Sequence, residues 1–72
     1  MNTNFQTGPY TQQEKINFRA ALETYPINEY RSSQRRFRAM SAFMGTREEE
    51  SIRSHYNLHI KSKGIREDQY QP

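Results

Sequence analysis

Hydrophobic residues recur every three or four positions in three separate stretches of the chain, which is the spacing of one face of an α-helix. In the first stretch these positions are Phe18, Ala21, Leu22 and Tyr25. Thr11 and Glu14 precede them with the spacing of a capping box, in which each side chain bonds the other residue's backbone amide. Pro26 follows, and it ends a helix because it has no amide hydrogen and disfavours a helical residue before it. The pattern predicts a helix at about residues 11–24.

The second stretch leaves its starting point open. Its stripe consists of Phe37, Met40, Ser41 and Met44. It ends at Gly45, because glycine adopts the left-handed conformation of a helix end without a steric cost. Tyr30 and Ser33 extend the stripe, so the helix could begin as early as Asn28; alternatively, Ser32 or Ser33 caps a shorter helix. We favour the longer helix, which places three basic side chains on or beside its exposed side: Arg31, Arg35 and Arg38.

The third stretch, from Gly45 to Lys63, predicts one helix with two different faces. Thr46 and Glu49 have the spacing of a second capping box, which predicts a helix at about residues 47–62. Its inward face carries Ile52, Tyr56 and Ile60, with His55 and His59 at the flank. Its opposite face carries Arg53, Ser54, Asn57 and Lys61, together with Glu50. A helix that follows a tight turn and has a core side and a donor side is typical of the second helix of a helix-turn-helix.

No stretch alternates as a β-strand would, so the sequence predicts an all-α three-helix bundle with a helix-turn-helix. We expect one domain at residues 10–63, preceded by a disordered polar arm at residues 1–9 and followed by a frayed tail at residues 64–72. The predicted core consists of Tyr10, Phe18, Leu22, Tyr25, Phe37, Met40, Met44, Ile52, Tyr56 and Ile60.

Composition narrows the class of protein. The chain has 72 residues, no cysteine and no apolar run near the length of a membrane span, and its N-terminus lacks the apolar region of a secretory signal. Its net charge of +3 is unevenly distributed. Residues 31–66 hold nine Lys and Arg side chains against three Glu, whereas residues 1–30 hold more acidic than basic side chains. A basic half of this kind indicates a polyanion as partner.

The residues of the three stretches resemble a Myb or SANT-type repeat, a homeodomain-like variant of the helix-turn-helix. Residues 10 to about 61 carry the resemblance. Helix 1 matches at Tyr10-Thr11, Glu14, Phe18, Ala21, Leu22 and Tyr25, and helix 2 at Phe37, Met40-Ser41 and Met44-Gly45. Helix 3 matches at Thr46-Arg47 and at Ile52-Arg53-Ser54-His55-Tyr56-Asn57. The chain departs from the family in having no tryptophan, in Pro26 and Glu48, and in a longer connection from Tyr25 to Phe37; that connection resembles the divergent Myb-like domains of telomere-associated proteins.

The resemblance implies a nuclear protein that binds double-stranded DNA with its third helix in the major groove, in a telomeric or transcriptional role. The alternative is a SANT-like module that binds a histone tail or a partner protein, and the run Glu48-Glu49-Glu50 favours that alternative. The chain is also expected to be part of a longer parent that holds further DNA-binding repeats or contacts a protein partner.

The expected base contacts are Arg53, Ser54 and Asn57, because Arg and Asn can bond guanine and adenine edges through two hydrogen bonds each. Glu50 lies on the same face and could accept from a cytosine amine or cap the helix; we favour the cap. The expected phosphate contacts are Arg31, Arg35, Arg36, Arg38, Arg47, Lys61 and Lys63.

The sequence gives no support for catalysis, a cofactor or a metal. His55 and His59 are four residues apart, a spacing that can place two imidazoles on one metal, but no cysteine or suitably spaced acid accompanies them. We expect His55 to pack at the edge of the core and to bond a backbone carbonyl. The only aspartate, Asp68, lies in the tail, so no Ser/His/Asp set is suggested.

Overall fold

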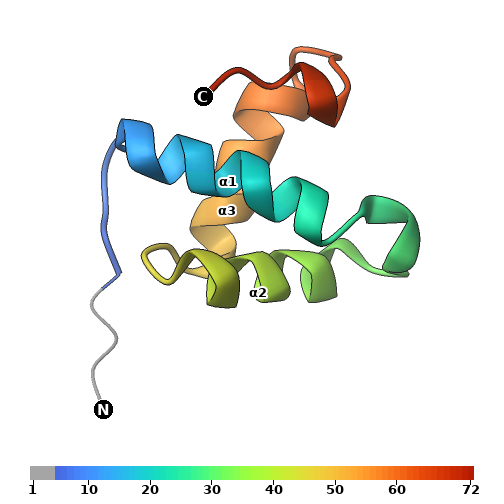
Figure 1. The fold of residues 1–72 in the computed structure, drawn as a ribbon, viewed down its shortest axis with the longest axis horizontal. Coiled ribbons are helices and arrows are strands. Elements are labelled where there is room, and N and C mark those ends of the chain that lie inside the picture. Colours follow the sequence, from blue (N-terminus) through green and yellow to red (C-terminus); the bar gives the residue numbers. More distant parts are fainter. Residues whose placement is uncertain (1–4) are drawn as a thin grey trace.

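The computed structural model describes residues 5–72, and this range contains helices and turns but no strand (Figure 1). The elements are α1 (Gln12–Thr24), η1 (Ile27–Glu29), α2 (Ser33–Met44), α3 (Glu49–Tyr56), η2 (Asn57–Lys61) and η3 (Glu67–Gln69). The prediction of an all-α fold with three main helices is confirmed. Within the described range, no helix has both the length and the apolar character that crossing a bilayer requires.

The first helix begins and ends close to the predicted residues. Thr11 caps α1, and its hydroxyl accepts a hydrogen bond from the Glu14 amide at 3.1 Å. The Glu14 carboxylate accepts in turn from the Thr11 amide at 2.9 Å, so the predicted capping box is confirmed. The helix ends at Thr24, ahead of Pro26.

The prediction that the second helix begins as early as Asn28 is wrong, and the alternative of a shorter helix capped by a serine is correct. The hydroxyl of Ser32 accepts from the Arg35 amide at 3.3 Å and caps α2 at Ser33. Residues 27–29 form the separate turn η1, while Tyr30 and Ser32 have extended backbone. The spacing of the hydrophobic stripe continues through residues 27–32 and so did not show where the helix begins. A serine just outside the helix accepts a hydrogen bond from an amide of the first turn, and this fixes the start. Gly45 ends α2 with φ 76°, in the left-handed conformation predicted for it.

The third helix starts later than predicted, and Thr46 does not cap it. The Thr46 hydroxyl donates to the Glu14 carboxylate at 2.8 Å, and α3 begins at Glu49 with Glu48 as a cap that makes no side-chain bond. The helix then widens into the π-helical segment η2, where the Ser62 amide donates to the Asn57 carbonyl at 2.8 Å. Together α3 and η2 cover residues 49–61 of the predicted range 47–62.

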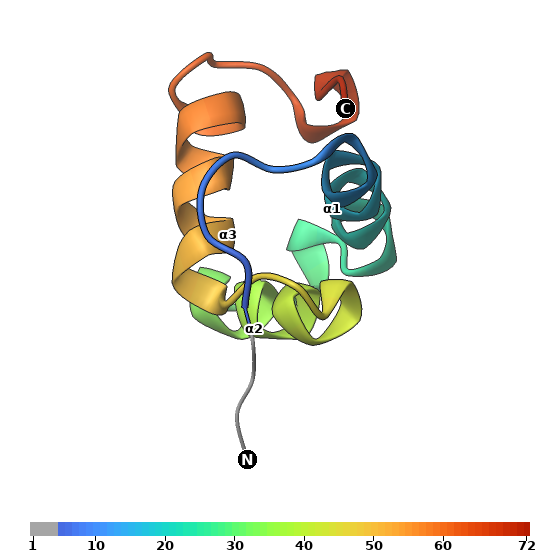
Figure 2. The same cartoon turned by 90° about the vertical axis from the view of Figure 1, so that its left-hand side faces the viewer.

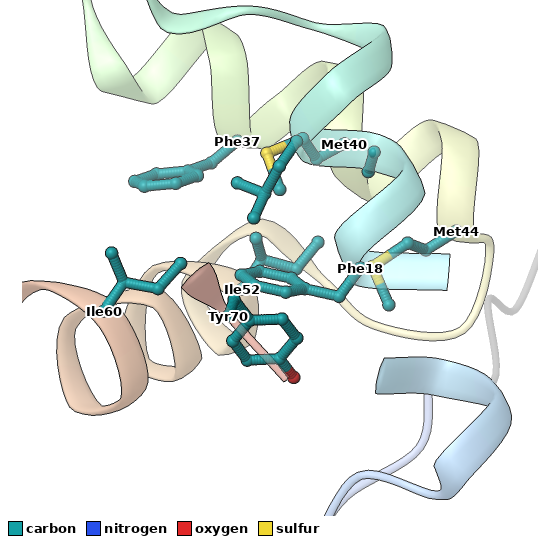
Figure 3. Packing of buried hydrophobic residues seen from close by; sticks show 9 residues of the cluster. Phe18, Phe37, Met40, Met44, Ile52, Ile60 and Tyr70 are labelled. Carbon is teal, nitrogen blue, oxygen red and sulfur yellow. The ribbon is translucent and has the colours of Figure 1, made fainter. Parts of the chain in front are cut away.

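α1 and α2 lie beside each other, and α3 crosses both of them (Figures 1 and 2). The side chains enclosed between the three helices form the core shown in Figure 3. Its buried members are Phe18, Ala21, Leu22, Phe37, Met40, Met44, Ile52, Ile60 and Tyr70, and the partly buried Tyr10, Tyr25, Tyr56 and Ile65 pack against them. Every predicted core residue is in this cluster, and Ala21 and Tyr70 are the buried members that the predicted core left out.

The expectation of a frayed tail is wrong. Figure 2 shows the C-terminal segment leaving the end of η2 and crossing to α1. There Tyr70 is buried, with its ring centroid 5.0 Å from that of Phe18, and the Arg19 guanidinium donates to the Tyr70 carbonyl at 2.9 Å. An aromatic side chain that fills the open end of the core orders the segment that carries it.

The expectation of a disordered arm is wrong for residues 5–9, since the Gln6 amide donates to the Thr46 carbonyl at 2.8 Å. Residues 1–4 of that predicted arm lie outside the described residues.

Candidate functional site

The outer face of α3 and η2 carries the predicted donor side chains. Ile52 and Ile60 are buried, which fixes the rotation of the helix and turns the opposite side outward. Ser54, Asn57, Lys61 and Glu50 are exposed, and Arg53 is partly exposed. The predicted division into a core side and a donor side is confirmed.

Carboxylates of its own helix hold Arg53. Its Nη1 lies 2.5 Å from Oε1 of Glu50, and its Nη2 lies 3.7 Å from Oε2 of Glu49. The guanidinium also lies 6.0 Å from the centre of the Phe37 ring of α2. The carboxylate of Glu50 therefore bonds a side chain of its own face, and the preferred role of Glu50 as a helix cap is wrong.

Four further basic side chains of the predicted set are exposed, and one of them contacts α3. Arg38 of α2 reaches across to Glu49 of α3, with 3.5 Å between Nε and Oε1. Arg35 belongs to the first turn of α2, and Arg31 lies just ahead of that helix. Lys63 is exposed just after η2. These residues, together with Lys61, remain available to an anionic partner.

Arg36 is not available to such a partner, so its predicted role as a phosphate contact is wrong. The residue is 2% exposed, and its two terminal nitrogens donate to the two oxygens of Glu67 at 2.6 Å each. It also donates to the carbonyls of Tyr25 at 2.7 Å and Leu22 at 3.2 Å. The spacing gave a signal for this burial, because Arg36 lies one helical turn before the core residue Met40.

Arg47 is buried to the same extent, and its predicted role as a phosphate contact is also wrong. It is 2% exposed and donates to the two oxygens of Glu14 at 2.7 and 2.8 Å. Its other bonds go to the carbonyls of Gly8 at 2.9 Å, Pro9 at 3.0 Å and Gln6 at 3.2 Å. Its guanidinium stacks over the Tyr10 ring at 4.2 Å. No local pattern in the sequence indicated this set of partners.

His55 lies at the edge of the core as predicted, but its hydrogen-bond partner differs. Its Nε2 is 2.7 Å from the hydroxyl of Tyr70, not from a backbone carbonyl, and its ring stacks on Tyr10 at 3.9 Å. Burial lowers the pKa of His55 to about 4, so its imidazole is neutral at pH 7. Across residues 5–72, no three side chains of His, Cys, Asp or Glu gather in a way that could hold a metal ion.

One comparison with known proteins gives a match. A family model described as a Myb-like DNA-binding domain matches residues 7–60 of the chain. The matched range contains all of α1, α2 and α3, and it ends ahead of the C-terminal segment that carries Glu67 and Tyr70. No curated protein and no solved structure matches the chain.

Proposed function

The chain belongs to the family of Myb-like DNA-binding domains, and we propose on that basis that it binds double-stranded DNA in a sequence-specific manner, with α3 in the major groove. One observation carries this proposal: α3 and η2 bury Ile52 and Ile60 and present an outward row of donor side chains. A helix of this kind fits the width of the major groove, where each base pair offers a distinct set of donors and acceptors.

The proposed base contacts are Arg53, Ser54 and Asn57. A guanidinium matches the two acceptors of guanine, O6 and N7, and a carboxamide matches the donor and acceptor of adenine. A serine hydroxyl can donate or accept and so contributes to either. Glu50 lies on the same face and could accept from the amine of cytosine.

The proposed phosphate contacts are the exposed basic residues of the predicted set: Arg31, Arg35, Arg38, Lys61 and Lys63. Contacts of this type fix the position of a protein on the duplex and supply affinity without sequence information. They also release counterions, so binding through them weakens steeply as the salt concentration rises.

A DNA-binding domain acts where the DNA is, and we therefore propose a nuclear location. The long connection between α1 and α2 supports a role like that of telomere-associated proteins, and a role in transcription is the alternative. We also propose that the chain works within a longer parent, beside further repeats or a protein partner.

Titration of duplex DNA tests the proposal. A preferred site is first selected from random duplexes, and its single-base variants are then compared. Arg53→Ala is expected to cost about 1–3 kcal/mol at one base pair and to relax the preference there alone. The matched control is Arg35→Ala, which is expected to weaken binding to all duplexes alike and to reduce the salt dependence. Equal losses across every variant would reject base contact by Arg53, and no duplex binding at low salt would reject DNA binding.

A SANT-like protein-interaction module is the second candidate function. The observation that favours it is the acidic start of α3, where Glu49 and Glu50 already neutralise Arg53. This surface would suit a basic segment such as a histone tail. A titration with a basic histone-tail peptide, run beside the duplex titration, separates the two candidates: saturable binding of the peptide without binding of duplex would favour the module.

A further inference from the structure

A chain of four alternating charges crosses the face that we assign to DNA. Arg38 of α2 contacts Glu49, Glu49 contacts Arg53, and Arg53 contacts Glu50. The side chain of Glu49 is 26% exposed, against 72% for Glu50, so the two carboxylates differ in freedom of movement. Glu49 bridges two helices from a partly buried position, whereas Glu50 lies at the solvent end of the chain.

In the free protein, the two terminal nitrogens of Arg53 already face carboxylates of the same helix. Its Nη1 is committed to Glu50, and its Nη2 faces Glu49. To bond a base edge through two hydrogen bonds, the guanidinium must give up the bond to Glu50. An exposed ion pair of this type contributes little to stability, so the exchange costs little.

A base that replaces the Glu50 carboxylate must offer hydrogen-bond acceptors to the Arg53 guanidinium. In the major groove guanine presents two adjacent acceptors, whereas adenine presents an acceptor beside a donor. Guanine can therefore accept two hydrogen bonds from Arg53, in place of its one bond to Glu50 and its 3.7 Å contact with Glu49, whereas adenine can accept one. A backbone phosphate also has paired oxygens, but it is an anion and would be repelled by the nearby carboxylate. Breaking the bond to Glu50 costs the same with every partner, but the carboxylate also repels a phosphate, and only guanine offers two adjacent acceptors in return.

We propose that Glu50 is a specificity-determining residue, whose carboxylate occupies the Arg53 guanidinium until a guanine edge replaces it. This inference rests on the proposed function. Specificity is a difference between affinities, and a group that disfavours the wrong partners contributes to it as much as a group that favours the right one.

The test compares Glu50→Gln with Glu48→Gln. Both changes remove one negative charge from the start of α3, and Glu48 makes no ion pair within residues 5–72. Both variants are expected to bind all duplexes more tightly, because the protein becomes more basic. Only Glu50→Gln is expected to reduce the preference for guanine at the base pair that Arg53 contacts, by about two- to five-fold, the range that a surface ion pair permits.

The same titrations in the Arg53→Ala background complete the test. There Glu50→Gln is expected to leave the base preference unchanged, because the side chain on which it acts is gone. An equal effect of the two glutamine variants on preference would show that charge alone acts and would overturn the proposal, as would unchanged preference in Glu50→Gln. If the wild type binds no duplex at low salt, the proposed function fails first, and this inference fails with it. Circular dichroism of each variant checks that the fold is kept.

Discussion

Two buried arginines tie the ends of this chain to its core, and they do so in different ways. In the N-terminal cluster, Arg47 bonds both oxygens of Glu14 and three carbonyls of the segment before α1. In the C-terminal cluster, Arg36 bonds both oxygens of Glu67 and two carbonyls near the end of α1. The arginines are equally buried, but the side chain of Glu14 is 7% exposed and that of Glu67 is 23% exposed.

The carboxylates respond to these surroundings differently. The hydrogen bonds from Arg47 are the main cause that lowers the pKa of Glu14 to about 2. Burial of Glu67 by itself raises its pKa, but the hydrogen bonds from Arg36 and Tyr56 outweigh burial and hold the pKa below its usual value. The ionisation of Glu14 therefore depends more on its arginine partner than the ionisation of Glu67 does.

The two clusters also differ in their relation to the family. Both Arg47 and Glu14 lie inside the range that matches the Myb-like domain, whereas Glu67 lies beyond it. Arg36 lies in the part of the chain that matches the family, and Glu67 of the C-terminal segment binds it in a buried position. Its neighbour Arg35 stays exposed. Adjacent arginines on one helix can have unrelated roles, and only their partners distinguish them.

The largest effect is expected from Glu14→Ala. This change leaves the buried guanidinium of Arg47 without its charge partner, and breaking a buried pair costs about 3–5 kcal/mol. A loss of that size approaches the whole stability of a small domain, so the variant should be largely unfolded. Urea unfolding followed by circular dichroism measures it. The control is Glu23→Ala, which removes an exposed α1 carboxylate paired with Arg19 at 3.4 Å; similar unfolding midpoints for the two variants would contradict the role of the N-terminal cluster.

Acid is expected to lower the free energy of unfolding without removing any side-chain volume. The pKa of His55 is about 4 in the fold and near 6.5 when exposed, so its contribution is complete above pH 6.5 and is lost as the pH falls to 4. The pKa of Glu14 falls from 4.5 to about 2 on folding, so its contribution is lost between pH 4.5 and 2. Unfolding free energies measured from pH 8 to 2 should decline through both windows. His55→Gln should make the decline in the upper window shallower without flattening it, because burial also lowers the pKa of His59, which still titrates there. A flat profile between pH 6.5 and 4 in the wild type would be the contrary result.

Glu67→Ala is expected to cost about 1.5–3 kcal/mol, the range for hydrogen bonds to a charged group. The cost is smaller than for Glu14 because Arg36 keeps the Tyr25 and Leu22 carbonyls and gains access to water. Hydrogen exchange should show the loss of protection concentrated in residues 65–70. A loss of stability as large as that of Glu14→Ala would mean that the two clusters do not differ in strength.

The smallest effect is expected from Tyr70→Phe. Burial raises the pKa of Tyr70 to about 12, so its hydroxyl is neutral in the fold and its bond to His55 joins two neutral groups. Loss of such a bond costs about 0.5–1.5 kcal/mol, while the ring still fills the core. Thermal melts measure the difference, with Tyr30→Phe as the control outside the C-terminal segment. A cost of several kcal/mol would indicate that the hydroxyl, and not the ring, holds the segment in place.

The sequence by itself determined the three helices and the way each one faces. The capping box at Thr11 and the left-handed end at Gly45 are local features, set by residues within a few positions of each other, and both are present. The spacing of apolar residues also placed Phe18, Phe37 and Ile52 in the core and turned Asn57 outward. Local hydrogen bonding and helical periodicity act over one or two turns, so a linear pattern records them.

Only the tertiary structure decided which charged residues are buried and whether the C-terminal segment is ordered. Arg36 and Glu67 are 31 positions apart, and Arg47 and Glu14 are 33 apart. Periodicity can place a guanidinium on the inward side of a helix, as it does for Arg36 one turn before Met40, but an arginine stays buried only if a carboxylate arrives to pair with it. Glu67 is placed beside Arg36 because Tyr70, three residues later, packs against Phe18. The site that Tyr70 occupies forms only when α1, α2 and α3 pack together.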